Sequence, residues 1–290
     1  MPDVPGPLLV VDAPSMLFRA FYALPESIEG ADGRPVNALL GTANLILREV
    51  EEHAPRAVVL CFGPDAADYR LELYEGYHAD RPEVPDGLAP QFKGSRAFFE
   101  AFNWVVAESE THEADDLLGS FAELEAKAGG SVLVMTGDRD MFQCASQHVK
   151  VLYVRTGKQG AELIGPAEVR KRYGIAPKLV PDFIALRGDP SDGIPGARGI
   201  GEKTAAELLG RRGSLDAVLD GAVRESRPSV RRALLESRDE LLRFREIATL
   251  QTVKVKLPKD RPTDFAGAAA AARERGMNRL AERMDKAASG

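Results

Sequence analysis

The chain has 290 residues, of which 44% are hydrophobic and 28% are charged, so it can bury a sizeable core and wholesale disorder is not expected. No apolar run is long enough to cross a bilayer, and residues 1–7 lack the basic stretch of a secretory signal, so we expect a cytoplasmic protein. Cys61 and Cys144 then read as reduced core thiols. The net charge of −6 argues at first against a nucleic-acid partner. It decides nothing by itself, because divalent ions held by clustered acids would reverse the local sign.

Five short apolar runs predict strands that are buried on both faces, as in parallel sheets. In chain order they are residues 8–12, 56–62, 104–107, 131–136 and 149–154. Helical patterns alternate with them, including residues 36–52, 89–102 and 115–128. This alternation predicts an α/β fold with a doubly wound, mostly parallel sheet, in which ligands bind at the carboxyl ends of the strands.

The rest of the chain differs from this pattern. Residues 65–90 are polar and charged and predict a helix with an irregular excursion above the sheet edge. From about Pro166 the pattern is helical, followed by a Pro-rich connector and a single Ala-rich final helix at 265–284. The predicted helices lie at 166–173, 177–186, 201–209, 214–219 and, as one or two helices, within 229–249. We therefore expect an α/β core at 1–165, a helical subdomain at 166–255, and a connector with a helix at 256–290.

Acidic residues gather at the predicted strand ends and helix starts. They are Asp12, the group Glu113, Asp115 and Asp116, the pair Asp138 and Asp140, and the pair Asp189 and Asp192. Carboxylates suit Mg²⁺ and Mn²⁺, and two such ions about 3.5–4 Å apart can bind both oxygens of a phosphoryl displacement. Each group alone could instead be a helix cap or a turn. Their joint occurrence favours a two-metal site.

A glycine-rich segment, Gly193-Ile-Pro-Gly-Ala-Arg-Gly-Ile-Gly-Glu-Lys-Thr, runs into a predicted helix. Gly199 and Gly201 leave backbone N–H groups open to a phosphate at the helix start, and Lys203 and Thr204 follow in its first turn. Such binding would be independent of base sequence. The segment resembles helix–hairpin–helix DNA-binding elements, although an ordinary helix–helix turn remains possible.

Taken together, the motifs resemble the 5′ nuclease family, which includes the N-terminal nuclease domain of bacterial DNA polymerase I, phage flap endonucleases and stand-alone bacterial 5′-3′ exonucleases. The resemblance covers roughly residues 8–255. It rests on LLVVDAPSMLFRAFYAL, HEADDLLGS, TGDRDMFQ and RGDPSDGIPGARGIGEKTAAELL. It implies a PIN-like or resolvase-like core, a helical arch at 65–90 and a helix–three-turn–helix subdomain that grips duplex DNA. No polymerase segment follows, so we expect a stand-alone bacterial member.

The resemblance also implies roles for single residues. One metal is expected near Asp12, Glu113 and Asp115 with Asp116 close by, and a second near Asp138, Asp140, Asp189 and Asp192. Phosphate contacts are implied for Arg19, Arg70 and Arg81, with Arg70 and His78 counted in the catalytic set with Asp12, Asp115, Asp138, Asp140 and Asp189. Further DNA contacts are implied for Gly33, Arg34, Asn37, Gly199, Ile200, Gly201, Glu202, Lys203 and Thr204. A potassium ion could bind the main-chain carbonyls of Leu186, Arg187, Pro195, Ala197 and Ile200.

Two departures from the family pattern stand out. The family has an acid after the second strand, but this chain has Phe62-Gly63, so the first metal loses a partner. The family's arch lysine is replaced by His78, and a neutral imidazole would stabilise phosphate charge poorly near pH 7. His78 is at least as well interpreted as a solvated arch residue.

The leading hypothesis is a two-metal 5′-3′ exonuclease or flap endonuclease of replication and repair. Its partners would be DNA with a 5′ end, flap, nick or RNA primer, with no membrane and no small-molecule cofactor, and it would act as a monomer associated with the nucleoid. One alternative is a flap-DNA-binding protein with weak or no catalysis because of Gly63. Another is a PIN-like ribonuclease, which the glycine hairpin disfavours.

Overall fold

A six-stranded sheet forms the centre of the molecule. The computed structural model describes residues 6–155 and 160–289; residues 1–5, part of the segment judged to lack a secretory signal, lie outside them. The strands are β1 (Leu8–Asp12), β2 (Ala57–Phe62), β3 (Val105–Glu108), β4 (Val132–Thr136), β5 (Val149–Val154) and β6 (Ala161–Ile164), in the order β3-β2-β1-β4-β5-β6. Neighbouring strands are parallel except β5 and β6. The predicted doubly wound sheet is confirmed.

The five predicted strands are all present. The four inner strands are buried on both faces as predicted, whereas β3 lies at the sheet edge and is only half-buried. In β1, Leu8 and Val10 belong to one apolar core, whereas Leu9 and Val11 belong to the other. The antiparallel edge strand β6 was not predicted. Its sequence AELI is short and only one of its four residues is buried, so it lacks the apolar run that marks the inner strands.

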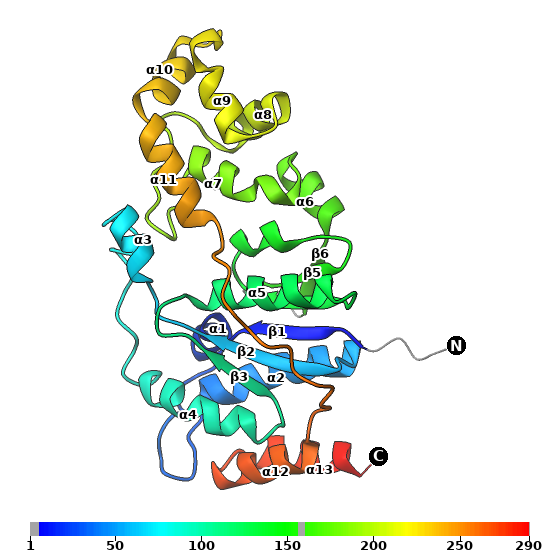
Figure 1. Cartoon of the computed structure of the whole chain (residues 1–290). Helices are drawn as coiled ribbons and strands as arrows, with labels where there is room; N and C mark the ends of the chain where they lie inside the picture. The colour runs from blue at the N-terminus through cyan, green and yellow to red at the C-terminus, as the bar shows by residue number, and fades with distance from the viewer. Residues whose placement is uncertain (1–5, 156–159, 290) are drawn as a thin grey trace.

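Helices cover both faces of the sheet (Figure 1). One face packs against α1 (Ala13–Ala23), α2 (Asn37–His53) and α4 (Ala89–Glu100), and α12 (Phe265–Glu274) and α13 (Asn278–Ala288) extend the same apolar core beyond α4. The other packs against α5 (Ala114–Lys127). The prediction of one helix at 265–284 is wrong, since the chain turns at Gly276 with a φ of +75° and forms two helices. Glycine adopts that left-handed conformation without a steric penalty.

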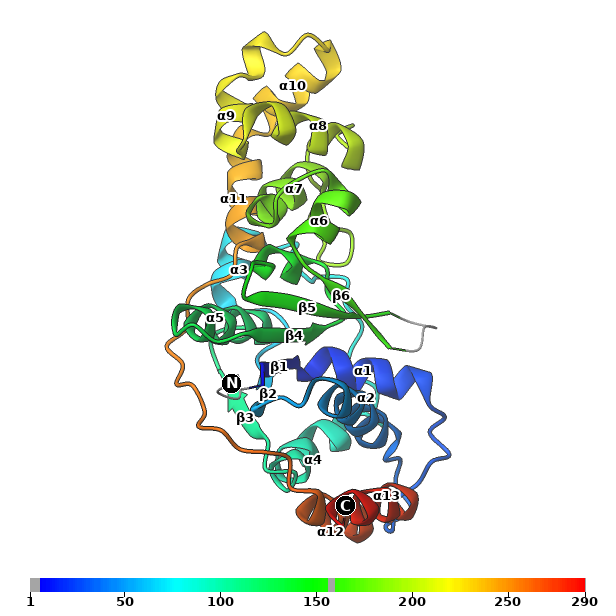
Figure 2. The same cartoon turned by 90° about the vertical axis from the view of Figure 1, so that its right-hand side faces the viewer.

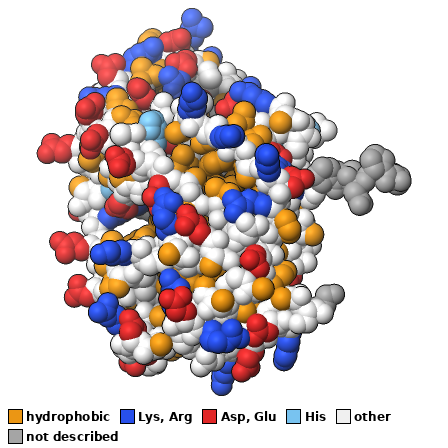
Figure 3. All heavy atoms as spheres, turned by 60° about the horizontal axis from the view of Figure 1, so that its bottom comes forward, with side chains coloured by type: hydrophobic (Ala, Val, Ile, Leu, Met, Phe, Trp, Pro, Cys, Tyr) orange, Lys and Arg blue, Asp and Glu red, His pale blue; other side chains and the backbone are white. Residues whose placement is uncertain are grey.

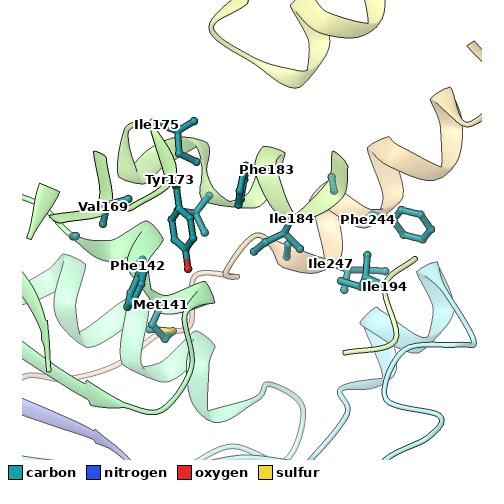
Figure 4. Packing of buried hydrophobic residues seen from close by; sticks show 14 of the residues in the cluster. Met141, Phe142, Val169, Tyr173, Ile175, Phe183, Ile184, Ile194, Phe244 and Ile247 are labelled. Carbon is teal, nitrogen blue, oxygen red and sulfur yellow. The ribbon is translucent and has the colours of Figure 1, made fainter. Parts of the chain in front are cut away.

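The segment expected to form an arch begins with α3 (Asp68–Leu73), and no helix or strand follows until α4. The helical region contains α6 (Pro166–Tyr173), α7 (Val180–Arg187), α8 (Glu202–Arg212), α9 (Leu215–Asp220), α10 (Pro228–Glu236) and α11 (Arg238–Ala248). Figure 4 shows that Met141 and Phe142, from the turn after β4, pack beneath Tyr173 and Phe183 of the helical region. The two regions therefore share one apolar core.

Residues 249–264 form an extended connector from α11 to the C-terminal helices, and it runs along the outside of α5 and past the sheet (Figures 1 and 2). Side chains and backbone hold it in place: Arg56 donates to the Pro258 carbonyl oxygen at 2.9 Å, and the Trp104 indole donates to Thr263 at 2.9 Å. Among the described residues, no helix combines the length and apolarity that a bilayer span requires.

Candidate active site

Three acids meet at the carboxyl ends of two neighbouring strands. Asp12 ends β1, and Asp138 and Asp140 follow β4, its parallel neighbour. The strand order reverses between β1 and β4, and such a switch point is where open α/β sheets bind ligands. Asp115 joins them from the first turn of α5, which packs against β1. Its proximity is seen in the repulsion that Asp12 and Asp138 exert on its charge.

Thr136 and Ser15 hold this arrangement, and neither was predicted as a site residue. The Thr136 hydroxyl donates to Asp12 Oδ2 at 2.7 Å and accepts from the Asp138 N–H at 3.0 Å. The Ser15 N–H donates to Asp12 Oδ1, and the Ser15 hydroxyl accepts from the Gly137 N–H. The signal available in the sequence was a hydroxyl residue, Thr136, at the end of one apolar strand, together with an acid at the end of another.

The electrostatics of the acids favour bound cations. Burial, followed by repulsion from Asp12 and Asp138, raises the pKa of Asp115 well above its ordinary value. Burial also raises the pKa of Asp140 well above that value, and that of Asp138 to about 7, with Asp192 adding repulsion to both. Carboxylates crowded in this way are destabilising unless positive charge is supplied. Oxygen donors of this kind suit Mg²⁺ or Mn²⁺.

The spacing of the acids fits hydrated ions. Among the described residues, the only three potential ligands with atoms all within 4.8 Å of one another are Glu49, Glu52 and His53, at the far end of α2. The strand-end acids stand further apart than that. Magnesium usually keeps several waters and binds through one or two carboxylates, so wider spacing suits it.

Asp189 and Asp192 lie on a tight hairpin after α7. The Asp189 N–H donates to the Ile194 carbonyl at 2.8 Å, and the Ile194 N–H donates back at 2.8 Å. The Asp189 side chain accepts from Arg187 at 2.9 Å and from Ser191. Both acids repel Asp138 and Asp140, so the hairpin faces the strand-end cluster. The acids predicted for the second ion therefore approach one another.

Glu113 and Asp116, at the start of α5, both pair with Arg70. Glu113 accepts from the Ala67 N–H and the Tyr77 hydroxyl at 2.9 Å, and pairs with Arg70 at 2.9 Å. Asp116 is fully buried and pairs with Arg70 at 3.0 Å. These contacts are those of a chain without bound ions, and the expected role of both carboxylates at the first ion stays a prediction. Arg70 is only 3% exposed, and its guanidinium is engaged by these two acids; the phosphate contact implied by the resemblance stays a prediction.

His78 is buried, and the interpretation of a solvated arch residue is wrong. Its Nδ1 lies 2.6 Å from the Asp65 carbonyl oxygen and its Nε2 lies 3.2 Å from Asp192 Oδ1. Arg81 also bonds Asp192, at 3.0 Å. Burial would raise the pKa of Asp192, but His78 and Arg81 outweigh it, and the pKa is lowered. The pKa of Asp192 is therefore lowered, whereas the pKa values of Asp138 and Asp140 are raised.

Gly63 follows β2 in a space that admits no side chain. A Cβ at this position would lie 2.4 Å from the His112 carbonyl oxygen and 2.7 Å from both the Ala114 nitrogen and the Glu113 carbonyl carbon. All three are backbone atoms, which cannot swing aside as a side chain would. The loop before α5 therefore occupies the position that an acid after β2 would need.

The side chains expected to bind DNA divide into exposed and buried groups. Arg19 Nη2 donates to the Gly137 carbonyl at 3.1 Å, beside Asp138, and Arg34 is exposed next to the open Gly33. Asn37 is fully buried and donates to the Phe21 and Leu24 carbonyls, so the expected DNA contact by its side chain is wrong.

The glycine hairpin presents an open helix N-terminus. A Cβ added at Gly199, which has a φ of +79°, or at Gly201, which precedes α8, would meet no atom within 4 Å. Glu202 and Lys203 are exposed and Thr204 is half-buried. Ile200 is buried, and its N–H donates to Ala197, so the expected DNA contact by Ile200 is wrong. The acid Glu202 would repel a phosphate, which leaves its N–H as the group that could contact one.

Comparison with known proteins matches this geometry to a family. Residues 7–174 match the model of the 5′-3′ exonuclease N-terminal resolvase-like domain, and residues 175–267 match its C-terminal SAM fold. The chain belongs to the 5′-3′ exonuclease family. The chain is 39% identical over 237 residues to a 5′-3′ exonuclease of Mycobacterium tuberculosis. The match covers 75% of this chain and 74% of that protein.

Two further relatives extend the comparison. DNA polymerase I of the same bacterium is 38% identical to this chain over 244 residues. The match covers 84% of this chain and 27% of the polymerase. The T5 D15 protein, co-crystallised with metal ions, has the same fold, with a TM-score of 0.71 at 16% identity, covering 97% of this chain and 99% of that one. The resemblance inferred from the motifs is confirmed.

Proposed function

We propose that this chain is a structure-specific 5′ nuclease that hydrolyses DNA phosphodiesters with two Mg²⁺ or Mn²⁺ ions. The observation that carries the proposal is the cluster of buried and half-buried, mutually repelling carboxylates at the switch point of the sheet. Asp12, Glu113 and Asp115 would hold one ion, with Asp116 close by, and Asp138, Asp140, Asp189 and Asp192 would hold the other. Such a pair of ions activates a water and neutralises charge on the scissile phosphate. A cation-filled site also accounts for DNA binding by a chain of net charge −6.

The chain's own residues would bind and orient the DNA. The open backbone at Gly199 and Gly201, with Lys203, would bind phosphates without regard to sequence. Arg19 and Arg81 stand beside acids of the cluster, where their charge would meet the scissile phosphate. Arg34 would contact the duplex beyond the cut. Carbonyls at Leu186, Arg187, Pro195, Ala197 and Ile200 would hold a potassium ion at the hairpin.

The substrates would be DNA carrying a 5′ end, flap, nick or RNA primer, which places the work in replication and repair at the nucleoid of the cytoplasm. The products would be a 5′-phosphate and a 3′-hydroxyl, released by a monomer. We divide the chain for this work into a nuclease core at 1–165, a DNA-gripping subdomain at 166–255 and a C-terminal segment at 256–290.

Cleavage of a labelled 5′-flap duplex in Mg²⁺ and in Mn²⁺ tests the proposal. Asp138→Asn and Asp189→Asn are expected to abolish cleavage with substrate in excess. Asp220→Asn is the matched control, since Asp220 is exposed and pairs with Arg238 far from the cluster. Cleavage by the two active-site variants at the wild-type rate would rule out this site. Faster cleavage of single-stranded RNA than of flap DNA would instead support a ribonuclease.

A second candidate is a flap-DNA-binding protein without turnover, favoured by the absence of an acid at Gly63. It predicts structure-selective binding and no product even in Mn²⁺. The same assay separates the two, because binding would persist while cleavage stays absent in the wild-type chain.

A further inference from the structure

Two arginines lie against one tyrosine ring, one strand away from the acids of the proposed metal site. The Nε of Arg139, which follows Asp138, donates to the Tyr153 hydroxyl at 3.0 Å, and its guanidinium carbon lies 5.9 Å from the centre of the Tyr153 ring. The guanidinium carbon of Arg172, near the end of α6, lies 5.8 Å from the same ring centre. Because Tyr153 of β5 pairs with Thr136 of β4, this arginine patch, Arg139 and Arg172, adjoins the acids that follow β4.

The positive charge of the arginine patch is only partly neutralised. Arg172 pairs with Glu162 of β6 at 2.7 Å, and Arg155 lies 3.8 Å from the same carboxylate. Arg139 is exposed and, among the residues that the structure describes, forms no ion pair. Three arginines therefore share one carboxylate. A guanidinium that an aromatic ring holds in place keeps N–H groups free, and these can donate two parallel hydrogen bonds to a phosphate.

The patch also lies next to the helix that carries the open glycine backbone. Figures 1 and 2 show α6 between the β5–β6 pair and α8. A Cβ at Gly174, directly after α6, would lie 3.9 Å from the Ala206 Cβ of α8. Burial raises the pKa of Tyr173, the charges of both patch arginines lower it, and the charge of Glu202 at the start of α8 raises it, so all of these groups lie near one hydroxyl. The arginine patch therefore lies between the strand-end acids and the N-terminus of α8.

We propose that Arg139 and Arg172 bind a backbone phosphate of the DNA duplex, at a position between the scissile phosphate and the phosphate held by the glycine hairpin. This inference rests on the proposed function, which places one phosphate at the acids and another at Gly201 and Lys203. A strand that reaches from the first to the second passes the arginine patch. Contact with a third phosphate fixes the distance along the strand between the cut and the hairpin, and it reads no base.

The affinity for a labelled 5′-flap duplex, measured by anisotropy in Ca²⁺ over a range of salt concentrations, tests the patch. Each phosphate contact that is lost lowers the slope of log affinity against log salt by about 1. Arg139→Gln and Arg172→Gln are each expected to show that loss, whereas Arg139→Lys keeps the charge and the wild-type slope. Arg48→Gln is the matched control: Arg48 is half-buried and pairs with Glu49, but it lies near the end of α2, which leads to the amino end of β2, at the opposite edge of the sheet from the acids. Its slope is expected to match the wild type.

A second measurement locates the phosphate. In a series of flap duplexes, each carries one neutral methylphosphonate in place of a phosphate, and the loss of affinity is compared between the wild type and Arg139→Gln. At the contacted position the wild type loses affinity and the variant loses no more. That position is expected between the scissile phosphate and the phosphate identified in the same way with Lys203→Ala.

Three results would overturn the inference. A folded Arg139→Gln variant could keep the wild-type salt slope. Arg139→Gln and Arg139→Lys could lose affinity equally at an unchanged slope, which would show a structural role for Arg139. The losses from Arg139→Gln and from the methylphosphonate could add at every position. Absence of flap cleavage by the wild type in both Mg²⁺ and Mn²⁺ would instead refute the proposed function, and the binding measurements would still decide whether the patch contacts DNA.

Discussion

Replacing Asp138 by asparagine is expected to stabilise the protein in the absence of metal while removing its activity. Burial and the charges around Asp138 raise its pKa to about 7. At pH 8 the wild-type side chain is therefore ionised in a site that disfavours its charge. Asparagine keeps the Oδ1 that accepts from the Asp140 N–H at 2.8 Å and removes the charge. The free energy of unfolding of the variant then rises by the amount by which the ionised carboxylate destabilised the wild type.

The magnitude follows from the size of the shift. One pH unit of pKa shift corresponds to about 1.36 kcal/mol, so a rise from 3.8 to about 7 sets an upper bound of about 4 kcal/mol. Because Asp138 is half-buried and its neighbours titrate with it, we expect about 1–3 kcal/mol. A carboxyl whose pKa is raised on folding stabilises the fold fully below pH 4, and this contribution is lost as the pH rises through 7. The gain of the variant over the wild type should thus be large at pH 8 and small at pH 4.

Urea unfolding of both proteins in a chelating buffer, at several pH values from 4 to 8, measures this difference. Adding Mn²⁺ should reverse the order at pH 8, since a bound ion stabilises only the chain that can ligate it. A variant less stable than the wild type at pH 8 without metal would refute the account of the acids as a site under electrostatic strain. An equal gain at pH 4 and pH 8 would show that the stabilisation does not come from the charge.

Three further changes have defined outcomes. Gly63→Asp should lower Tm and fail to raise flap cleavage, because a backbone carbonyl oxygen lies 2.4 Å from the new Cβ; a large rise in cleavage would contradict this. Lys203→Ala should weaken flap binding equally across sequences and lower the slope of log affinity against log salt by about 1, as measured by anisotropy. Gly276→Ala should lower Tm more than Gly129→Ala, because both have positive φ but only Gly276 abuts the backbone of residues 30–31; equal Tm losses would count against that contact.

The strands and the acids at their ends could be predicted because both signals are local. A short apolar run is visible in the sequence itself, and so is the acid that ends it in β1 or follows it by two residues in β4. The antiparallel strand β6 and the break at Gly276 could not be read in this way. The first has little apolar character, and a single glycine inside an Ala-rich stretch does not show whether the chain continues or turns.

The partners of the polar side chains were the part that the sequence could not supply. The resemblance to the 5′ nuclease family implies DNA contacts for Arg70 and Asn37, and arginine and asparagine are usually exposed. Arg70 is buried because α3 and α11, far apart in sequence, close over the start of α5. Asn37 is buried at the contact between α2 and α4, where Gln91 of α4 donates to it at 2.9 Å. Such contacts depend on tertiary packing, which no local pattern encodes.

Charge shows the same limit. The net charge of −6 argued at first against a nucleic-acid partner, but the net charge does not describe how charges are distributed over the surface. On the face shown in Figure 3, Lys and Arg side chains alternate with Asp and Glu and no area of one sign dominates. The acids of the proposed metal site are buried or half-buried and gather around the carboxyl ends of β1 and β4. Their charge acts on bound ions at short range, where solvent screens it least.

Gly63 shows why the missing acid is not a local defect. Three backbone atoms of residues 112–114 stand where its Cβ would be, so the loop before α5 comes closer to β2 than any side chain would allow. That loop leads directly to Asp115. The lost carboxylate and the position of Asp115 are therefore two results of one backbone path. Adding an acid at Gly63 would push away the helix start that presents Asp115, and the site would lose one ligand as it gained another.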